Sequence, residues 1–128
     1  MTVTGRVLLV EDDKFLRRAC EASLRQRGFD VMSATDGTEG LRIAREAPAP
    51  DVILLDLLMP KMSGIEVLRA LKGDPATAAI PVVILSNSSR DEDKREAMQL
   101  GAVGYHVKAN LSLKDLAAEV NLLLERRP

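Results

Sequence analysis

The feature that most constrains the fold of this chain is a regular alternation of short apolar runs with segments of helical periodicity. The runs are typical of β-strands, and they occur at Val7–Val10, Val31–Ala34, Val52–Leu55, Val82–Leu85 and around Tyr105–Val107. Those that begin at residues 7, 52 and 82 are continuous and rich in Val, Ile and Leu. Such continuity is typical of a parallel strand that is covered on both faces.

The segments between these runs have the apolar spacing of amphipathic helices. The first has a stop signal at Gly28, and its expected buried face consists of Phe15, Leu16, Ala19, Cys20, Ser23 and Leu24. Each later segment opens with an N-capping residue followed three positions later by Glu or Asp. These pairs are Asp36 and Glu39, Ser63 and Glu66, Ser89 and Glu92, and Ser112 and Asp115.

A β-strand followed by an α-helix, repeated five times, predicts an α/β protein with a parallel sheet and helices on both faces. In sheets of this kind, ligands bind beyond the carboxyl ends of the strands, where the order of the strands reverses. The residues that the chain places at its strand ends therefore decide what it can do.

Length and composition narrow the class of protein further. The 128 residues, 46% hydrophobic and 29% charged, suffice for one globular domain. A net charge of −1 and a pI of about 5.9 argue against a basic surface for nucleic acid or membranes. Cys20 is the one cysteine, which excludes an internal disulfide. No apolar segment is long enough for a signal peptide or a membrane span, so we expect a soluble cytoplasmic protein.

Polar side chains follow four of the five expected strands. They are Glu11, Asp12 and Asp13 after the first strand, Asp56 after the third, Ser86 and Asn87 after the fourth, and Lys108 after the fifth. Because the carboxyl ends of parallel strands share one edge of the sheet, we expect these groups to lie close together. Clustered carboxylates raise one another's pKa unless a cation intervenes.

Oxygen ligands with open water positions suit Mg²⁺, and a nearby lysine would attract a phosphoryl group. A carboxylate placed there can act as a nucleophile and form an acyl phosphate. Each residue also has a simpler interpretation. The whole role of Asp12 or Asp13 could be to cap a helix, and Asp56 could be an Asx-turn residue. Ser86 and Lys108 could be ordinary loop and surface residues. Their joint placement favours a functional site.

Four segments resemble the receiver domain of two-component response regulators, namely VLLVEDDKFLRR, DVILLDLLMPKMSGIEVLRALK, IPVVILSN and LGAVGYHVKAN. The D-x-x-M-P-x-M-S-G pattern that starts at Asp56 is the most specific of these signals. The resemblance covers residues 6–124, within one domain of residues 1–128. It implies a single-domain regulator of the chemotaxis type. The implied fold is a flavodoxin-like (βα)5 three-layer sandwich, with its five-stranded parallel sheet in the order 2-1-3-4-5.

The same resemblance implies roles for individual residues. Asp56 matches the phosphoacceptor. Asp12 would bind Mg²⁺ directly and Glu11 through water, while Asp56 and the backbone carbonyl of Leu58 would complete the protein ligands. Lys108 would pair with the phosphoryl oxygens.

Ser86 matches the hydroxyl that bonds the phosphoryl group, and Tyr105 matches the aromatic residue that moves with it. Phosphorylation adds nearly two negative charges and three acceptor oxygens at one point. We expect Ser86 to follow this group inward and Tyr105 to turn from an exposed to a buried position. The fourth helix, fifth strand and fifth helix would then change their packing and form the output surface, which in many receivers is also a homodimer interface.

The implied function is phosphorylation-controlled signalling. The chain would take its phosphoryl group from a sensor histidine kinase or phosphotransfer protein and then change its contacts with a downstream protein. Nothing before residue 6 or after residue 126 resembles an output domain, so we expect a stand-alone receiver or one separated from its output domain. It would be a signalling domain rather than an enzyme, without direct binding to nucleic acid.

Two rival functions follow from the same residues. Phosphatases of the haloacid dehalogenase type carry a second Asp two residues after the nucleophile, where this chain has Leu58. A degenerate receiver that serves only as a scaffold is disfavoured by the intact Glu11, Asp12, Asp56 and Lys108.

Several positions depart from the family pattern. Ala109 stands where the family has a proline preceded by a cis bond, and a cis bond before a non-proline residue costs about 3 kcal/mol, so a trans or a strained cis bond is expected. Asn87 replaces a small residue, which predicts a less free inward turn of Tyr105. Leu58 and Ser88 occupy positions that tune hydrolysis of the acyl phosphate. An apolar Leu58 cannot orient an attacking water, which predicts a long-lived phosphoryl group.

Overall fold

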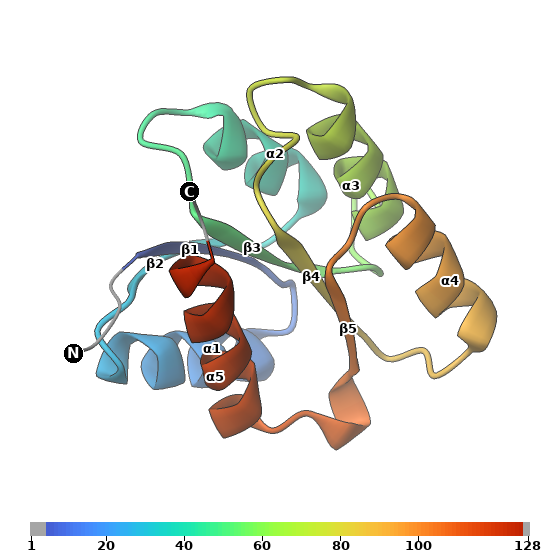
Figure 1. The fold of residues 1–128 in the computed structure, drawn as a ribbon. Helices are drawn as coiled ribbons and strands as arrows, with labels where there is room; N and C mark the ends of the chain where they lie inside the picture. Colours follow the sequence, from blue (N-terminus) through green and yellow to red (C-terminus); the bar gives the residue numbers. More distant parts are fainter. Residues whose placement is uncertain (1–4, 127–128) are drawn as a thin grey trace.

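The computed structural model describes residues 5–126. In this range five strands form one sheet in which every neighbouring pair is parallel (Figure 1). The strands are β1 (Arg6–Val10), β2 (Asp30–Ala34), β3 (Val52–Asp56), β4 (Val82–Ser86) and β5 (Gly104–Val107). Their order is β2-β1-β3-β4-β5, which confirms the predicted fold class and sheet order.

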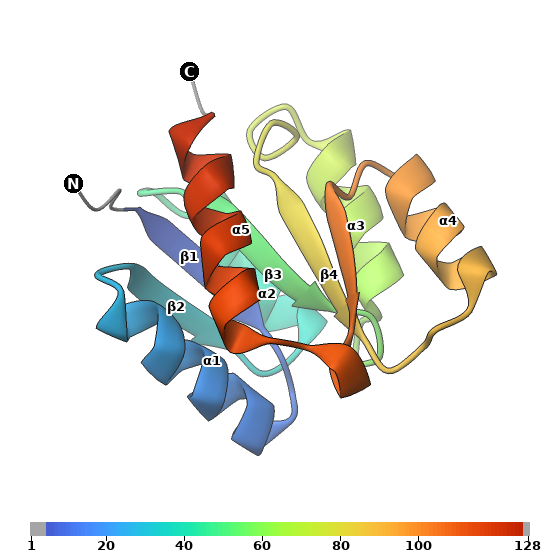
Figure 2. The same ribbon diagram turned by 60° about the horizontal axis from the view of Figure 1, so that its bottom comes forward.

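Helices cover both faces of this sheet. Across the described residues they are α1 (Lys14–Gln26), α2 (Gly37–Arg45), α3 (Gly64–Gly73), α4 (Asp91–Gln99) and α5 (Leu113–Glu125), with a short 3-10 helix at Lys108–Asn110. Figures 1 and 2 show α1 and α5 side by side on one face and α2, α3 and α4 on the other. Within residues 5–126, no helix has both the length and the apolar character needed to cross a membrane.

The central strands are apolar on both sides because each side faces a different core. Val7 and Leu9 of β1 pack into the core beneath α1 and α5, whereas Leu8 and Val10 pack into the core beneath α2 and α3. All four side chains are fully buried. Burial of one such side chain contributes roughly 1.5–3 kcal/mol, so the sheet is a firm platform for the residues at its edge.

The buried face of α1 is narrower than the apolar pattern predicts. Phe15 is 87% exposed and Ala19 is exposed as well, so their predicted inward positions are wrong. The residues that face the core are the half-buried Leu16 and the buried Cys20 and Leu24, which follow one another every four positions. Phe15 and Ala19 precede Leu16 and Cys20 by one residue each and therefore lie about 100° around the helix from this line.

Three of the four predicted helix caps are confirmed. The side chains of Asp36, Ser63 and Ser112 each accept a hydrogen bond from the amide three residues later. The predicted cap at Ser89 is wrong, because α4 starts at Asp91 with Arg90 in the capping position. Among the described residues, the Arg90 side chain makes no capping hydrogen bond. The nearest substitute is Ser88, whose Oγ accepts the Arg90 N–H at 3.2 Å.

Candidate functional site

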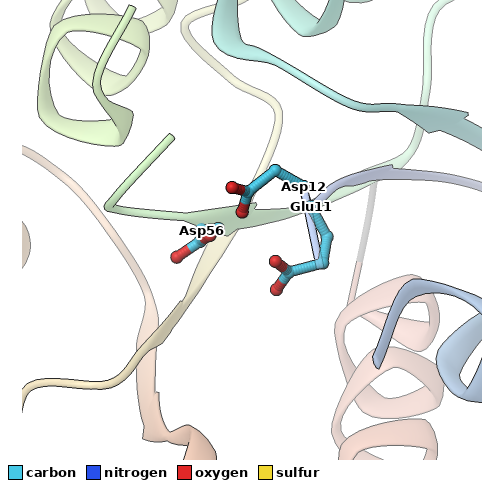
Figure 3. Close-up of side chains that lie close together, drawn as sticks. All are labelled: Glu11, Asp12 and Asp56. Carbon is cyan, nitrogen blue, oxygen red and sulfur yellow. The ribbon is translucent and has the colours of Figure 1, made fainter. Parts of the chain in front are cut away.

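Three carboxylates meet at the carboxyl edge of the sheet, as the strand order requires. Glu11 follows β1 and Asp56 ends the neighbouring β3, and their exposed fractions are only 0% and 2%. Asp12, next to Glu11, is exposed. One oxygen from each of the three carboxylates lies within 4.8 Å of the others, and Figure 3 shows the groups turned toward a common space.

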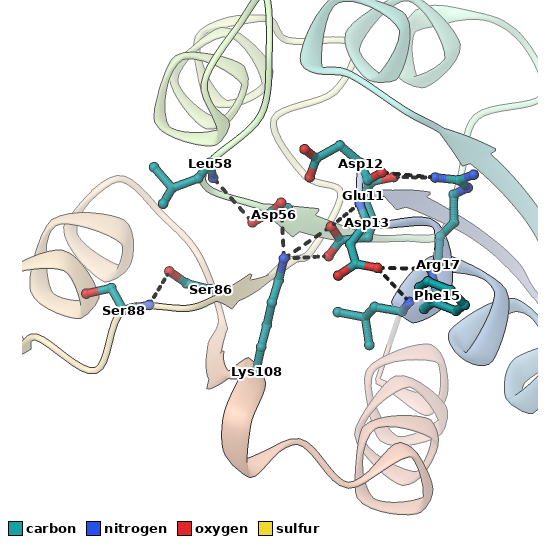
Figure 4. Close-up of polar contacts among 11 residues, drawn as sticks. Glu11, Asp12, Asp13, Phe15, Arg17, Asp56, Leu58, Ser86, Ser88 and Lys108 are labelled. Carbon is teal, nitrogen blue, oxygen red and sulfur yellow. Dashed lines mark hydrogen bonds and ion pairs between the residues drawn. The ribbon is translucent and has the colours of Figure 1, made fainter.

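Lys108 brings a positive charge to this cluster from the far side of the sheet. Its Nζ lies 2.9 Å from Glu11 Oε1 and 3.2 Å from Asp56 Oδ2 (Figure 4). Among residues 5–126, these two buried oxygens find no hydrogen-bond partner of good geometry, so the ammonium is their compensating charge. Buried carboxylate oxygens without hydrogen bonds are the donor atoms that a hard cation prefers.

The electrostatics of the site follow from this burial. Desolvation, and then repulsion from Glu11, raise the pKa of Asp56 from its usual 3.8 to about 7, although Lys108 acts in the opposite direction. Burial by itself would lower the pKa of Lys108, but the contacts with Glu11 and Asp56 outweigh it and raise that pKa. Beneath the site, burial and the nearby Glu11 raise the pKa of the Cys20 thiol to about 11, as suits an unreactive core thiol.

The loop after β1 contains Asp12 and Asp13, and the sequence alone could not decide which of the two caps α1. Asp13 Oδ1 accepts the N–H groups of Phe15 at 2.9 Å and Leu16 at 3.2 Å, so Asp13 rather than Asp12 caps α1. The Arg17 side chain donates to the carbonyls of Glu11 at 3.2 Å and Asp12 at 3.4 Å. This role of Arg17 in holding the loop was not predicted, although its place on the first turn after the acids is a usable signal.

The loop after β3 fixes Asp56 by close packing. The Leu58 N–H donates to Asp56 Oδ1 at 3.2 Å, while the Leu58 side chain is 67% exposed and points away from Lys108 in Figure 4. The Gly64 N–H donates to the Leu57 carbonyl at 2.9 Å. A Cβ on Gly64 would lie 2.2 Å from the Asp56 carbonyl oxygen, so only glycine fits there. Gly64 ends the most specific motif, but residue spacing alone does not predict this close approach of the backbone.

Ser86 and Tyr105 lie on the other side of Asp56. Leu85 of β4 pairs with Asp56, which puts Ser86 one position beyond it on the adjacent strand. The buried Ser86 Oγ accepts the Ser88 N–H at 3.0 Å, and the Tyr105 hydroxyl donates to the Ser88 carbonyl at 2.9 Å. Tyr105 is half-buried, which corrects the expected exposed starting position.

Two further expectations concern this edge. Asn87 is exposed, and the predicted hindrance of the inward turn of Tyr105 stays a prediction. The cis peptide bond of residues 5–126 is Ala47–Pro48, so the bond between Lys108 and Ala109 is trans, and Lys108 reaches both carboxylates with it.

Comparisons with known proteins agree with this geometry. The sequence profile of the response regulator receiver domain matches residues 7–121. The chain is 41% identical to the transcriptional regulatory protein PrrA of Mycobacterium tuberculosis over 122 residues, which are 95% of this chain and 51% of PrrA. The solved structure of the phosphorylated cyanobacterial phytochrome response regulator RcpA is 34% identical, with a TM-score of 0.81 over 95% of this chain and 92% of that one. The Mn²⁺-bound form of the response regulator Rcp1 is 31% identical, with a TM-score of 0.81 over 97% of both chains.

The chain therefore belongs to the receiver domain family of two-component response regulators. Phosphorylation-controlled signalling is the general function of this family, in agreement with the function expected from the sequence. The chain spans about half the length, or less, of the curated relatives that it matches. Activities and partners of those whole proteins are therefore not assigned to it.

Proposed function

We propose that Asp56 accepts a phosphoryl group from a histidine kinase or phosphotransfer protein and that this modification controls the protein contacts of the chain. The observation that carries the proposal is the Asp56 carboxylate, buried at the end of β3 with Oδ2 only 3.2 Å from the Lys108 ammonium. A carboxylate held in this way, with lone pairs on Oδ2 that no hydrogen bond among residues 5–126 occupies, suits attack on an electrophilic phosphorus.

The donor set of the site fits Mg²⁺. Its three carboxylates offer only oxygen ligands, one of each within 4.8 Å of the others, and the exposed Asp12 leaves the site open to water. We assign Asp12, Asp56 and the Leu58 carbonyl as direct ligands and Glu11 as a ligand through water. When bound, the ion would offset the negative charge of the carboxylates and of the phosphoryl oxygens. The existence of a Mn²⁺-bound form of the similar regulator Rcp1 supports the binding of a divalent ion.

The proposed transfer is a displacement at phosphorus. An oxygen of Asp56 forms a bond to phosphorus, and the bond to the donor's imidazole nitrogen or acetate oxygen breaks, with its electron pair leaving on the donor. The product is an acyl phosphate. Lys108, already in contact with Asp56, supplies positive charge to the phosphoryl oxygens. In this proposal the domain promotes at most its own phosphorylation and dephosphorylation.

The output follows from the residues next to the acceptor. Ser86 can donate its hydroxyl hydrogen to a phosphoryl oxygen, and its loop neighbour Ser88 is bonded to Tyr105. We propose that Ser86 moves toward the phosphoryl group and that this movement changes the packing of α4, β5 and α5. The changed surface then binds a downstream protein or a second copy of the chain. The change is a population shift between two packing arrangements, since the phosphoryl group on Asp56 makes more favourable contacts in one of them.

Intact-protein mass spectrometry tests the proposal directly. The wild-type chain, incubated with Mg²⁺ and acetyl phosphate, should gain the mass of one phosphoryl group, and a chelator should prevent this gain. Asp56→Asn should gain nothing. Asp30→Asn removes an exposed aspartate at the opposite end of the sheet and should behave as wild type. Failure of the wild-type chain to gain mass, or a gain by Asp56→Asn equal to wild type, would refute the assignment.

A further inference from the structure

Ser88, in the loop between β4 and α4, forms hydrogen bonds to residues of three different elements through its backbone groups and its hydroxyl. Its N–H donates to Ser86 Oγ at 3.0 Å, and its carbonyl accepts the Tyr105 hydroxyl at 2.9 Å. Its Oγ donates to Asp93 Oδ2 in the first turn of α4 and accepts the Arg90 N–H at 3.2 Å. One residue therefore joins the end of β4, the start of α4 and the middle of β5.

Helix α4 has fewer stabilising contacts of its own than the other helices, so the hydrogen bonds of Ser88 matter more for its position. In the described part of the chain, α1, α2, α3 and α5 each begin with a capping side chain of their own, and α4 does not. Ala97 is the one residue of α4 that is buried, whereas α3 buries Val67, Leu68 and Leu71 in addition to Gly64. A helix with so little buried apolar surface is held in large part by the polar contacts at its ends.

A cavity of about 170 Å³ lies against the same segment. Its lining includes Leu57, Leu58 and Ile65 on the α3 side and Ser86, Ser88 and Asp93 on the α4 side. The loop between β4 and α4 therefore borders open space on the side that faces α3.

We propose that Ser88 is the positioning residue that passes the movement of Ser86 to α4, through its hydroxyl bond to Asp93. The inference rests on the proposed function, because the movement starts when Ser86 turns toward a phosphoryl group on Asp56. The Ser86 oxygen holds the Ser88 N–H, so a shift of Ser86 changes the position of Ser88. The Ser88 hydroxyl then moves Asp93 and, with it, the first turn of α4.

Amide hydrogen exchange in α4 provides the first test, with a matched pair of variants. Ser88→Ala removes the hydroxyl but keeps both backbone groups, and it should raise exchange at residues 91–99 by about tenfold, the effect of one hydrogen bond to a charged group. Ser89→Ala changes an exposed serine next to it and should leave exchange unchanged. Ser88→Thr keeps a hydroxyl and should restore the wild-type rates.

The aspartate end of the bond is tested in the same way. Asp93→Ala should raise exchange in α4 in the same direction as Ser88→Ala but by no more, because Ser88→Ala also removes the acceptor of the Arg90 N–H. The double variant should add no further change to Ser88→Ala, since the bond between the two side chains is already lost. Asp91→Ala removes a similar charge from the same turn and should have little effect. Equal rates in Ser88→Ala and Ser89→Ala, or in Asp93→Ala and Asp91→Ala, would overturn the proposed link.

The coupling itself is tested with beryllofluoride, a phosphoryl mimic that binds aspartate. Tyr105 is the one tyrosine and the chain has no tryptophan, so tyrosine fluorescence reports on this residue. In the wild-type chain, Mg²⁺ and beryllofluoride should change both the Tyr105 emission and the exchange of α4. In Ser88→Ala the Tyr105 response should remain, because the carbonyl is intact, and the response of α4 should be lost.

The outcomes separate this inference from the function on which it rests. A wild-type response of α4 in Ser88→Ala overturns the role of Ser88 and leaves phosphorylation of Asp56 in place. A wild-type chain that gains no phosphoryl mass and shows neither response overturns the proposed function, and the coupling with it.

Discussion

The connection after β3, the strand that ends at Asp56, and the connection after the neighbouring β4 leave the same edge of the sheet, but they are held in different ways. After β3, the chain is fixed by close packing: Gly64 lies where even a methyl group would overlap the Asp56 carbonyl, and Ser63 caps α3. After β4, the chain is held by hydrogen bonds of Ser88 and lies beside a cavity. It then enters α4, whose N-capping residue Arg90 makes no capping hydrogen bond through its side chain to any described residue.

This difference matches the two tasks that we propose for the site. Packed atoms resist small displacements strongly, because protein interiors have the density of organic crystals, and this suits the connection that holds the nucleophile. Hydrogen bonds exchange partners at a net cost of about 1 kcal/mol each, and this suits the connection that moves. Rigid and movable segments thus lie within one strand spacing of each other.

The largest expected effect is at the packed connection. Gly64→Ala should lower the free energy of unfolding by about 3 kcal/mol, because the new Cβ overlaps backbone that cannot move aside. Gly73→Ala, at the other end of α3, is the control, since beyond its chain neighbours and the nearby backbone of its own helix no described atom lies within 4 Å of the position that a Cβ would take there. It should change stability by about 1 kcal/mol or less, in the stabilising direction. Urea unfolding of both variants decides, and equal stabilities would contradict the packing difference.

The packed connection also holds an unfavourable charge, and Asp56→Asn should reveal it. Because the folded-state pKa of Asp56 is raised to about 7, the stability contributed by its protonated form is present below its unfolded value of 3.8 and is lost as pH rises through 7. Without divalent ions, Asp56→Asn should therefore match wild type near pH 4 and exceed it by about 3 kcal/mol at pH 8. Chemical unfolding across this range is the measurement, and a constant difference would contradict the titration.

The side chain of Leu58 should set the lifetime of the phosphoryl group. It is 67% exposed and apolar, so it cannot position a water for attack, and the acyl phosphate should be long-lived. Leu58→Asn introduces a hydrogen-bonding group and should shorten the lifetime about tenfold, equivalent to about 1.4 kcal/mol in the barrier. Leu122→Asn changes a half-exposed leucine on α5 and serves as the control. The decay of phosphorylated mass after donor removal gives both lifetimes, and a rapid wild-type decay would argue against the proposed role.

The smallest effect concerns the two serines that the sequence predicts to be equivalent caps. Ser63→Ala should lower the free energy of unfolding by about 1 kcal/mol, since Ser63 accepts the Glu66 N–H. Ser89→Ala should change it by less than about 0.5 kcal/mol, as is usual for an exposed residue away from such contacts. Thermal unfolding of the pair is sufficient, and a cost at Ser89 equal to that at Ser63 would place the start of α4 elsewhere.

The sheet and the clustering of its polar residues could be predicted because they depend on burial and chain direction alone. A continuous apolar run such as Val52–Leu55 fits only a strand covered on both faces, and parallel strands must then bring Glu11, Asp56 and Lys108 to one edge. Residue spacing identifies these features without any knowledge of individual contacts.

The positions that the sequence did not predict depend on local geometry. Phe15 lies one residue away from the buried line of α1, a shift that hydrophobicity does not reveal. Ser88 and Ser89 are adjacent and are followed, after Arg90, by three acids, so several capping registers have the same sequence signal. The requirement at Gly64 arises from backbone that approaches it in space, which no spacing rule reports.

Lys108 makes the acidic site resemble an ion exchanger that carries its own counter-ion. An arriving divalent cation must compete with a tethered ammonium for the oxygens of Glu11 and Asp56. In the proposed phosphorylated form, a phosphoryl group on Asp56 would offer that ammonium new oxygens and so release the old ones. By thermodynamic linkage, anything that draws Lys108 toward the phosphoryl group strengthens cation binding, and the cation favours the phosphorylated form by the same factor. In the activated state that we propose, the lysine would thus make the two charges mutually dependent.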